Sequence, residues 1–375
     1  MTKIYLVRHA EAEGNLFLRC QGHIDTRVTP RGEKQIAALK ARFASVPLDA
    51  CYSSDLKRAR QTAQALCEDR GLILSTDKRF REVNFGPLED MPYGQIEREF
   101  PGALAAFTAD PYHCSLEGME SFDESVSRFL EAMDQLAERH AGKSIAIASH
   151  GSVLRNVLIA LFYGAENQGA AGHSDNTAVS LLEYENGTYR LVYANDNSHL
   201  DEKISTIARQ NWWKEEPHED YNLWFKPFDL DHDTYLEIRR DAWQTIYGNL
   251  EGCNGEGFYE ELCNIMRYHP YAAAYAMYKD EVAGFIQLTP ARRRDLGVGY
   301  VGLVYMCPQF RNKGIGAQLI GYAVSQYRRL GRTSVELGCA KCNSHGQHFY
   351  EKLGFRVTGT VPGLQDDLLL EHLDL

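Results

Sequence analysis

Arg8 and His9 follow directly on a short apolar run, residues 4–7, near the start of the chain. Bulky, β-prone residues bounded by polar ones predict a buried strand, and open α/β sheets bind ligands at the carboxyl ends of their strands. A neutral imidazole is a nucleophile, and an adjacent guanidinium binds phosphate through a planar, bidentate fork. The pair therefore predicts a phosphorylatable histidine. Taken alone, it is more typical of a histidine that only satisfies local hydrogen bonds at a strand end.

The same arrangement recurs at two further predicted strand ends. A strand at residues 50–52 leads into a helix that carries Arg58 near its N-terminus, and a strand at residues 144–148 ends just before His150. The helix that begins after His150 has an N-terminus that favours anions. Two arginines and two histidines at three strand ends of one sheet, with Glu82 nearby, predict a phosphate-sized pocket with a nucleophile inside.

This half of the chain resembles the histidine phosphatase superfamily in several motifs that occur in order. They are LVRHAE at residues 6–11, LKRARQTA at 56–63, REVNFG at 81–86 and SHG at 149–151. The resemblance covers about residues 1–205 and implies an α/β domain with three α/β/α layers. By this resemblance His9 is the nucleophile and Glu82 the proton donor. The implied phosphate clamp consists of Arg8, Arg58 and His150.

The resemblance also implies that the polar loop after the first strand contacts substrate, through Asn15, Gln21 and Gly22. The reaction it implies passes through a phosphohistidine and uses no metal. A phosphoglycerate mutase is the main rival within the superfamily, but it needs extra basic residues beside the pocket to hold its doubly charged intermediate. Arg98 is the only arginine or lysine between residues 83 and 120. Hydrolysis of a small phosphomonoester is therefore favoured over mutase activity.

A second motif lies in the other half of the chain, where a predicted strand at residues 301–306 breaks at Pro308. The segment RNKGIG at residues 311–316 then opens a predicted helix. A nest of backbone N–H groups at a helix N-terminus binds pyrophosphate, and glycines allow the close approach. The motif is neither a dinucleotide fingerprint nor a nucleotide P-loop. Taken alone, it fits a plain strand–helix turn equally well.

Together with the segment from Asn343 to Phe355, this motif resembles the GNAT-family N-acetyltransferases, over about residues 220–375. The resemblance implies an α+β domain that binds acetyl-CoA and acetylates an amine, with Asn343 beside the pantetheine and Tyr350 protonating the departing thiolate. The implied acetyl-CoA contacts are Met306 and the amides of Arg311, Asn312, Lys313, Gly314, Ile315, Gly316 and Ala317. The general base stays unassigned, with Glu336 or a water chain as candidates. The basic run at residues 292–294 fits a solvated loop better than a site for an anionic group.

The length of 375 residues predicts two domains, which we place at residues 1–210 and 218–375. Trp212 and Trp213, in the charged segment between them, are expected to be buried at a domain interface. A formal net charge of −11 argues against binding to nucleic acid or an anionic membrane, and no apolar run is long enough to span a bilayer. Nine scattered cysteines without regular spacing favour a reducing compartment, so a cytoplasmic protein is expected. The pair Cys339 and Cys342 has no partner pair for a metal site.

The sequence thus predicts a bifunctional enzyme, a phosphomonoesterase fused to an acetyl-CoA-dependent N-acetyltransferase. The alternative is a phosphatase that carries a non-catalytic acyl-CoA-binding sensor. Neither the phosphorylated substrate, the acceptor amine, the coupling of the two activities nor the oligomeric state follows from the residues.

Overall fold

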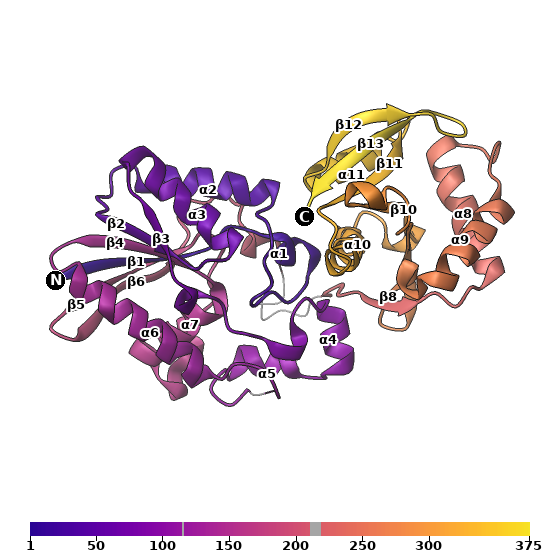
Figure 1. The fold of residues 1–375 in the computed structure, drawn as a ribbon. Helices are drawn as coiled ribbons and strands as arrows, with labels where there is room; N and C mark the ends of the chain where they lie inside the picture. Colours follow the sequence, from indigo (N-terminus) through magenta and orange to yellow (C-terminus); the bar gives the residue numbers. More distant parts are fainter. Residues whose placement is uncertain (115, 211–218) are drawn as a thin grey trace. The chain divides into compact units, whose positions relative to one another are not determined.

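The computed structural model describes residues 1–114, 116–210 and 219–375. They form two units, one made of Met1–Met91 with Ile96–Asp220 and the other of Pro92–Gln95 with Tyr221–Leu375. Each unit has its own sheet (Figure 1). Trp212 and Trp213, which we predicted to be buried at an interface, lie outside the described residues.

The first unit contains a six-stranded sheet in the order β3-β2-β4-β1-β5-β6. Strands β1 to β4 are parallel, whereas β5 and β6 run antiparallel to their neighbours. Parallel neighbours need crossover connections, and these place helices on the faces of the sheet. The strands are β1 (Thr2–Arg8), β2 (Ala50–Ser53), β3 (Leu74–Thr76), β4 (Ser144–Ser149), β5 (Val179–Glu185) and β6 (Thr188–Asp196).

Helices cover both faces of this sheet, which confirms the predicted three-layer α/β/α fold. Figure 1 shows α2 and α3 on one face and α6 and α7 on the other. Thr29 caps α2, whose first residue is Pro30, and Ser121 forms a capping box with Glu124 at the start of α6. The helices are α1 (Glu13–Phe17), α2 (Pro30–Phe43), α3 (Lys57–Cys67), α5 (Ala103–Ala109), α6 (Phe122–Arg139) and α7 (Gly151–Leu158). A further helix, α4 (Tyr93–Glu99), begins in the segment Pro92–Gln95 of the second unit and ends in the first.

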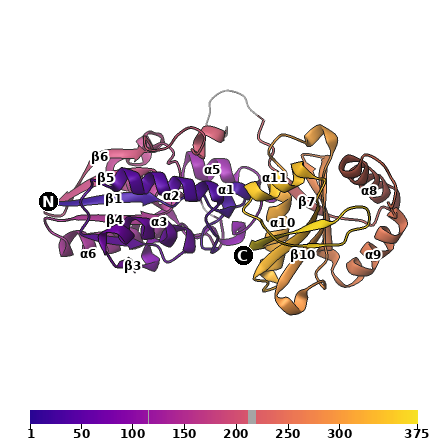
Figure 2. The same ribbon diagram turned by 90° about the horizontal axis from the view of Figure 1, so that it is seen from above.

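The second unit contains a seven-stranded sheet in the order β12-β13-β11-β10-β9-β8-β7. Figures 1 and 2 show α8 and α9 on one side of it and α10 on the other, which confirms the predicted α+β fold. The strands are β7 (Trp224–Pro227), β8 (Ala273–Tyr278), β9 (Glu281–Leu288), β10 (Val298–Met306), β11 (Ser334–Ala340), β12 (Arg356–Val361) and β13 (Leu368–Asp374). The helices are α8 (His232–Tyr247), α9 (Gly255–Tyr268), α10 (Ala317–Arg329) and α11 (Ser344–Lys352).

The parallel pair β10 and β11 separates half-way along its length. Pairing runs only from Val298 opposite Ser334 to Val301 opposite Leu337, although β10 continues to Met306. A strand that loses one neighbour exposes the backbone groups on that side. The second half of β10 therefore offers hydrogen-bonding groups to a ligand. No helix in the described parts of the chain is long and apolar enough to cross a membrane.

Candidate active site

Three neighbouring strands, β2, β4 and β1, deliver the predicted phosphate-handling residues to one edge of the first sheet. His9 follows β1, Arg58 lies in the first turn of α3 after β2, and His150 follows β4. The exposed fraction is 3% for His9 and 0% for both Arg58 and His150. The ring centroids of His9 and His150 are 5.1 Å apart. The structure therefore gathers these side chains in one buried cluster.

His9 is held in the form that a nucleophile requires. Its Nδ1 lies 2.7 Å from the carbonyl oxygen of Ala10. A carbonyl can only accept, so Nδ1 carries the proton and the lone pair stays on Nε2. Burial lowers the pKa of His9 well below 6.5, and the charges of Arg58 and Arg8 lower it further. The imidazole is therefore neutral and nucleophilic at neutral pH.

Arg8, the last residue of β1, lies against the start of α7. A Cβ added to Gly151 would be only 3.0 Å from Nε of Arg8. The guanidinium also donates a hydrogen bond to the carbonyl of Ser174. A glycine as the first residue of α7 thus leaves room for the Arg8 guanidinium beside the helix.

His150 and Arg58 carry buried polar atoms that no described residue satisfies. In the described part of the chain, both ring nitrogens of His150 and the Nε of Arg58 lack a hydrogen-bond partner. The pKa of His150 is held well below 6.5, mainly by burial and then by Arg58 and His9. Burial lowers the pKa of Arg58 to about 10, so its guanidinium stays charged at neutral pH. Buried polar groups of this kind normally have partners, which indicates a polar ligand here.

The loop after β1 positions Arg58. Its Nη1 donates to the carbonyl of Ile24 at 2.8 Å, and its Nη2 donates to Gly22 at 2.7 Å and to Gln21 at 3.4 Å. Asn15 accepts hydrogen bonds through Oδ1 from the Ala12 amide at 3.1 Å and from Nε2 of Gln21 at 3.2 Å. In this structure the three predicted substrate contacts therefore also build the loop that holds the clamp.

Glu89 ties this loop down, and the sequence reasoning missed it. Its carboxylate accepts from the amides of Gly22 at 3.2 Å, His23 at 2.9 Å and Ile24 at 3.1 Å. A Cβ on Gly22 would lie 2.0 Å from Oε1 of Glu89 and 2.4 Å from the carbonyl oxygen of Val83. Glycine at position 22 therefore lets the carboxylate reach all three amides. No local pattern announces a single glutamate in this role.

Glu82, the predicted proton donor, lies at the N-terminus of α7. Its Oε1 accepts from the amides of Val153 at 2.7 Å and Val83 at 3.0 Å, and its Oε2 accepts from Ser152 at 3.0 Å. We predicted that this helix N-terminus favours anions, and the anionic group that it holds in the structure is the carboxylate of Glu82.

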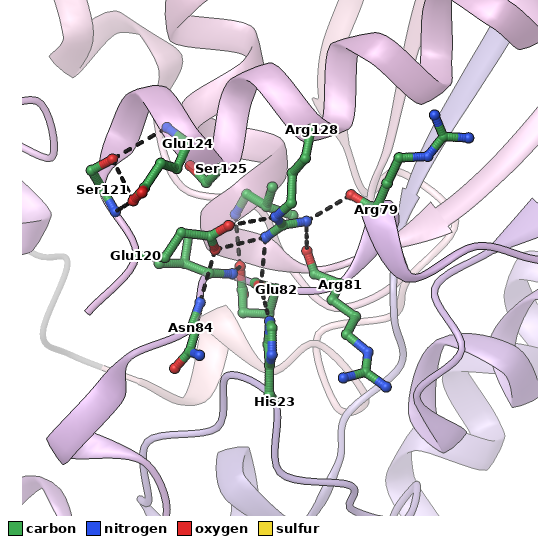
Figure 3. A network of polar contacts seen from close by, with 12 residues as sticks. His23, Arg79, Arg81, Glu82, Asn84, Glu120, Ser121, Glu124, Ser125 and Arg128 are labelled. Atoms are coloured by element: carbon green, nitrogen blue, oxygen red, sulfur yellow. Dashed lines mark hydrogen bonds and ion pairs between the residues drawn. The ribbon is translucent and has the colours of Figure 1, made fainter. Parts of the chain in front are cut away.

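Arg128 of α6 binds the backbone around Glu82, as Figure 3 shows. It donates to the backbone carbonyls of Arg79 at 2.6 Å, Arg81 at 2.8 Å and Glu82 at 2.8 Å. Its remaining bonds reach the two carboxylate oxygens of Glu120, at 2.5 and 2.9 Å. Its charge is also among those that lower the pKa of His150. The sequence reasoning did not identify Arg128, because a lone arginine on a helix has no distinguishing pattern.

The second unit has an open amide nest between β10 and α10. The amides of Asn312, Gly314, Ile315 and Gly316 donate no hydrogen bond within the described residues. Gly314 has φ +76°, a conformation that favours glycine. Arg311 anchors the start of the loop, since its Nε donates to the carbonyl of Met306 at 2.8 Å. Free amides at a helix N-terminus fit the pyrophosphate of a coenzyme A thioester.

Two further predicted residues of this unit lie on α11. Asn343 caps the helix by accepting from the Gly346 amide at 2.9 Å, and its Nδ2 makes no hydrogen bond within the described residues. Burial raises the pKa of the Tyr350 hydroxyl, and Cys339 and Glu371 raise it further. The phenol therefore keeps its proton at neutral pH, as a donor to a thiolate must.

Glu336, one candidate for the general base, is held as a counter-ion. Its Oε2 lies 2.7 Å from Nη1 of Arg293 and its Oε1 lies 3.0 Å from Nδ1 of His372. Arg292 lies over the ring of Tyr300 at 3.7 Å. Arg292 and Arg294 are exposed, as expected of a solvated loop, whereas Arg293 forms an ion pair with Glu336. Each oxygen of Glu336 thus lies beside a basic side chain.

The comparison with protein families decides the identity of the first unit. The model of the histidine phosphatase superfamily, branch 1, matches residues 4–197, just over half of the chain. The chain belongs to the histidine phosphatase superfamily. The model of the acetyltransferase (GNAT) family matches residues 213–355, so this histidine phosphatase also carries a GNAT domain. Both predicted resemblances are confirmed.

Relatives of this histidine phosphatase match its first half. Phosphoserine phosphatase 1 of Hydrogenobacter thermophilus is 28% identical over 202 residues, which are 54% of this chain and 96% of the relative. The metal-independent phosphoserine phosphatase of Arabidopsis thaliana is 31% identical over 205 residues, 53% of this chain and 84% of the relative. The solved structure of Bacillus stearothermophilus YhfR is 30% identical, with a TM-score of 0.51, and covers 53% of this chain and 99% of its own. These matches support a phosphatase.

Proposed function

We propose that the first unit hydrolyses a small phosphomonoester through a phosphohistidine at His9. The observation that carries this proposal is a neutral, buried His9 beside the unsatisfied donors of His150 and Arg58. Nε2 of His9 attacks phosphorus in line, and the ester oxygen leaves on the opposite side. Splitting one hard displacement into two steps is the advantage of covalent catalysis.

The clamp and Glu82 supply the rest of the chemistry. Arg8, Arg58 and His150 stabilise the charge on the three equatorial oxygens of the transferring phosphoryl group. Glu82 gives a proton to the leaving oxygen and then takes one from the water that attacks the phosphohistidine. Its Oε2 accepts a single amide hydrogen bond, whereas Oε1 accepts two, so Oε2 is the oxygen with room for that proton.

The first experiment measures hydrolysis of p-nitrophenyl phosphate with EDTA present. We expect the wild-type protein to turn over, and His9→Ala to lose activity by at least about a thousandfold, as removal of a covalent nucleophile does. An alkaline denaturing quench should trap a phosphoryl group on the wild-type protein alone, and acid should then release it, as expected of a phosphohistidine. His113→Ala is the matched control, because that histidine side chain is 81% exposed. Full activity in His9→Ala would contradict the mechanism.

For the second unit we propose an acetyl-CoA-dependent N-acetyltransferase. Acetyl-CoA supplies the acetyl group, and the free amides of Asn312, Gly314, Ile315 and Gly316 fit its pyrophosphate. Tyr350 holds the proton that the departing thiolate sulfur takes up. The GNAT family match and the open side of β10 support this proposal. We propose domain limits of 1–210 and 218–375.

The second experiment separates an enzyme from a sensor. Titration with acetyl-CoA followed by calorimetry measures binding, and release of the free thiol in the presence of an amine panel measures turnover. We expect turnover with at least one amine, and a loss of turnover with retained binding in Tyr350→Phe. Binding without thiol release across the panel would overturn the acetyltransferase and leave the sensor.

A further inference from the structure

Arg155 of α7 carries a positive charge that no described acidic side chain balances. Its Nε is buried without a hydrogen-bond partner, and its guanidinium makes no ion pair with any residue that the structure describes. Burial alone lowers its pKa. Arg155 as a whole is only partly buried, but its Nε is cut off from water, and a buried polar atom normally has a partner, so this atom points to a ligand that brings the opposite charge.

The position of Arg155 places that charge beside the phosphate clamp. Gly151, against which the Arg8 guanidinium lies, is four residues earlier on α7. Residues four apart share one face of a helix, with Cβ atoms about 6 Å apart. The Cα–Cβ bonds of a helix tilt towards its N-terminus, so the Arg155 side chain sets out towards Gly151. His173 lies near both arginines. Burial lowers the pKa of His173 most, and the charges of Arg155 and Arg8 lower it further.

The acidic groups of the pocket lie beside the clamp and not beside Arg155. Glu82 and Glu89 raise the pKa of Arg58, and Arg128 is paired with Glu120, whereas no carboxylate acts on the pKa of Arg155. A further ligand group of charge −1 would balance Arg155, and a carboxylate has that charge and fits a guanidinium through two parallel hydrogen bonds.

We propose that Arg155 binds a carboxylate on the same substrate whose phosphate Arg8 holds. The phosphatase then acts on phosphorylated acids in preference to phosphate esters that lack an acid group. The proposal rests on the phosphatase function proposed above, and it makes Arg155 a residue that determines specificity.

Matched substrate pairs test this proposal through the release of inorganic phosphate. O-phosphoserine and O-phosphoethanolamine differ only by a carboxylate, and 3-phosphoglycerate carries a carboxylate where glycerol 3-phosphate carries a hydroxymethyl group. We expect the wild-type protein to prefer the acid of each pair in kcat/KM by roughly 10- to 100-fold, the range of a charged hydrogen bond. Arg155→Gln should remove the preference by raising KM for the acid, while kcat/KM for the other ester changes by less than about threefold. Arg155→Lys should keep part of it.

Arg190→Gln is the control for loss of a positive charge, since Arg190 is 68% exposed and pairs with Glu183. It should leave the preference unchanged. An equal fall for both members of a pair in Arg155→Gln would overturn the specificity role, as would a wild-type protein without a preference.

A binding measurement keeps this test separate from the proposed function. Calorimetry on His9→Ala compares 3-phosphoglycerate with glycerol 3-phosphate without turnover, and Arg155→Gln is added in the same background. Tighter binding of the acid that depends on Arg155 supports the proposal even if the wild-type protein hydrolyses none of the esters, a result that would refute the phosphatase alone. Equal affinities would overturn the role of Arg155.

Discussion

Replacing Arg128 by methionine should damage the phosphatase unit more than any exposed charge change. The substitution keeps an apolar stem but removes all donors to three backbone carbonyls and to Glu120. The Arg128 side chain is 20% exposed and that of Glu120 is 14% exposed. Breaking a buried ion pair costs about 3–5 kcal/mol. Because water reaches part of this pair, we expect the free energy of unfolding to fall by about 3 kcal/mol, the lower end of that range.

Activity should fall with stability, because the lost bonds hold the backbone at Glu82. We expect kcat for p-nitrophenyl phosphate to drop by roughly tenfold to a hundredfold, the usual contribution of a positioned proton donor at its lower end. All four tryptophans lie beyond residue 210, so tryptophan fluorescence would not report the unfolding of the first unit. Its free energy of unfolding is therefore measured by pulse proteolysis in urea, which detects the fraction of the first unit that stays folded.

Arg79→Gln is the matched control for this prediction. It lies in the same network, but its side chain is 32% exposed and pairs with Asp77 and Glu131, with one further hydrogen bond to Gln135. Its backbone carbonyl still accepts from Arg128. We expect a loss below about 1 kcal/mol. An Arg128→Met protein that matches this control in both stability and kcat would refute the reasoning.

Two other predictions concern pH and the loop that holds the clamp. The folded-state pKa values of His9 and His150 lie below 6.5, so the folded protein resists protonation and stability should be lost as pH falls from 6.5 towards those values. Thermal melts and kcat/KM profiles between pH 4.5 and 8 check this, and an acid limb of kcat/KM at or above pH 6.5 would contradict a neutral His9. In Gly22→Ala, the new Cβ would meet the carbonyl oxygen of Val83 at 2.4 Å, and relief of that clash moves the carbonyl that holds Arg58. We expect a loss of about 1–3 kcal/mol in stability and a fall in kcat/KM of more than about tenfold, measured by urea unfolding and steady-state kinetics.

The members of the phosphate cluster could be predicted from the sequence because each follows a local pattern. Apolar runs that stop just before His9 and His150 predict strand ends. Apolar residues at helical spacing predict the helix that carries Arg58 in its first turn. Parallel strands place their carboxyl ends at one edge, so local patterns were enough to bring the three together. The amide nest from Asn312 to Gly316 was equally visible, because glycines between a strand and a helix are a local signal.

The tertiary structure decided the groups that act on this cluster from other elements. Glu82 accepts hydrogen bonds from the amides of α7, and Arg128 of α6 donates to the backbone at Glu82. In the second unit, Glu336 forms an ion pair with Arg293 and contacts His372. The proposed role of Arg155 depends on which face of α7 lies against Arg8. Each of these roles is set by which distant segments pack together, and a single polar residue in a sequence carries no record of its distant partners. The sequence therefore determined the chemistry of the site, whereas packing determined which charges are balanced and which are left for a ligand.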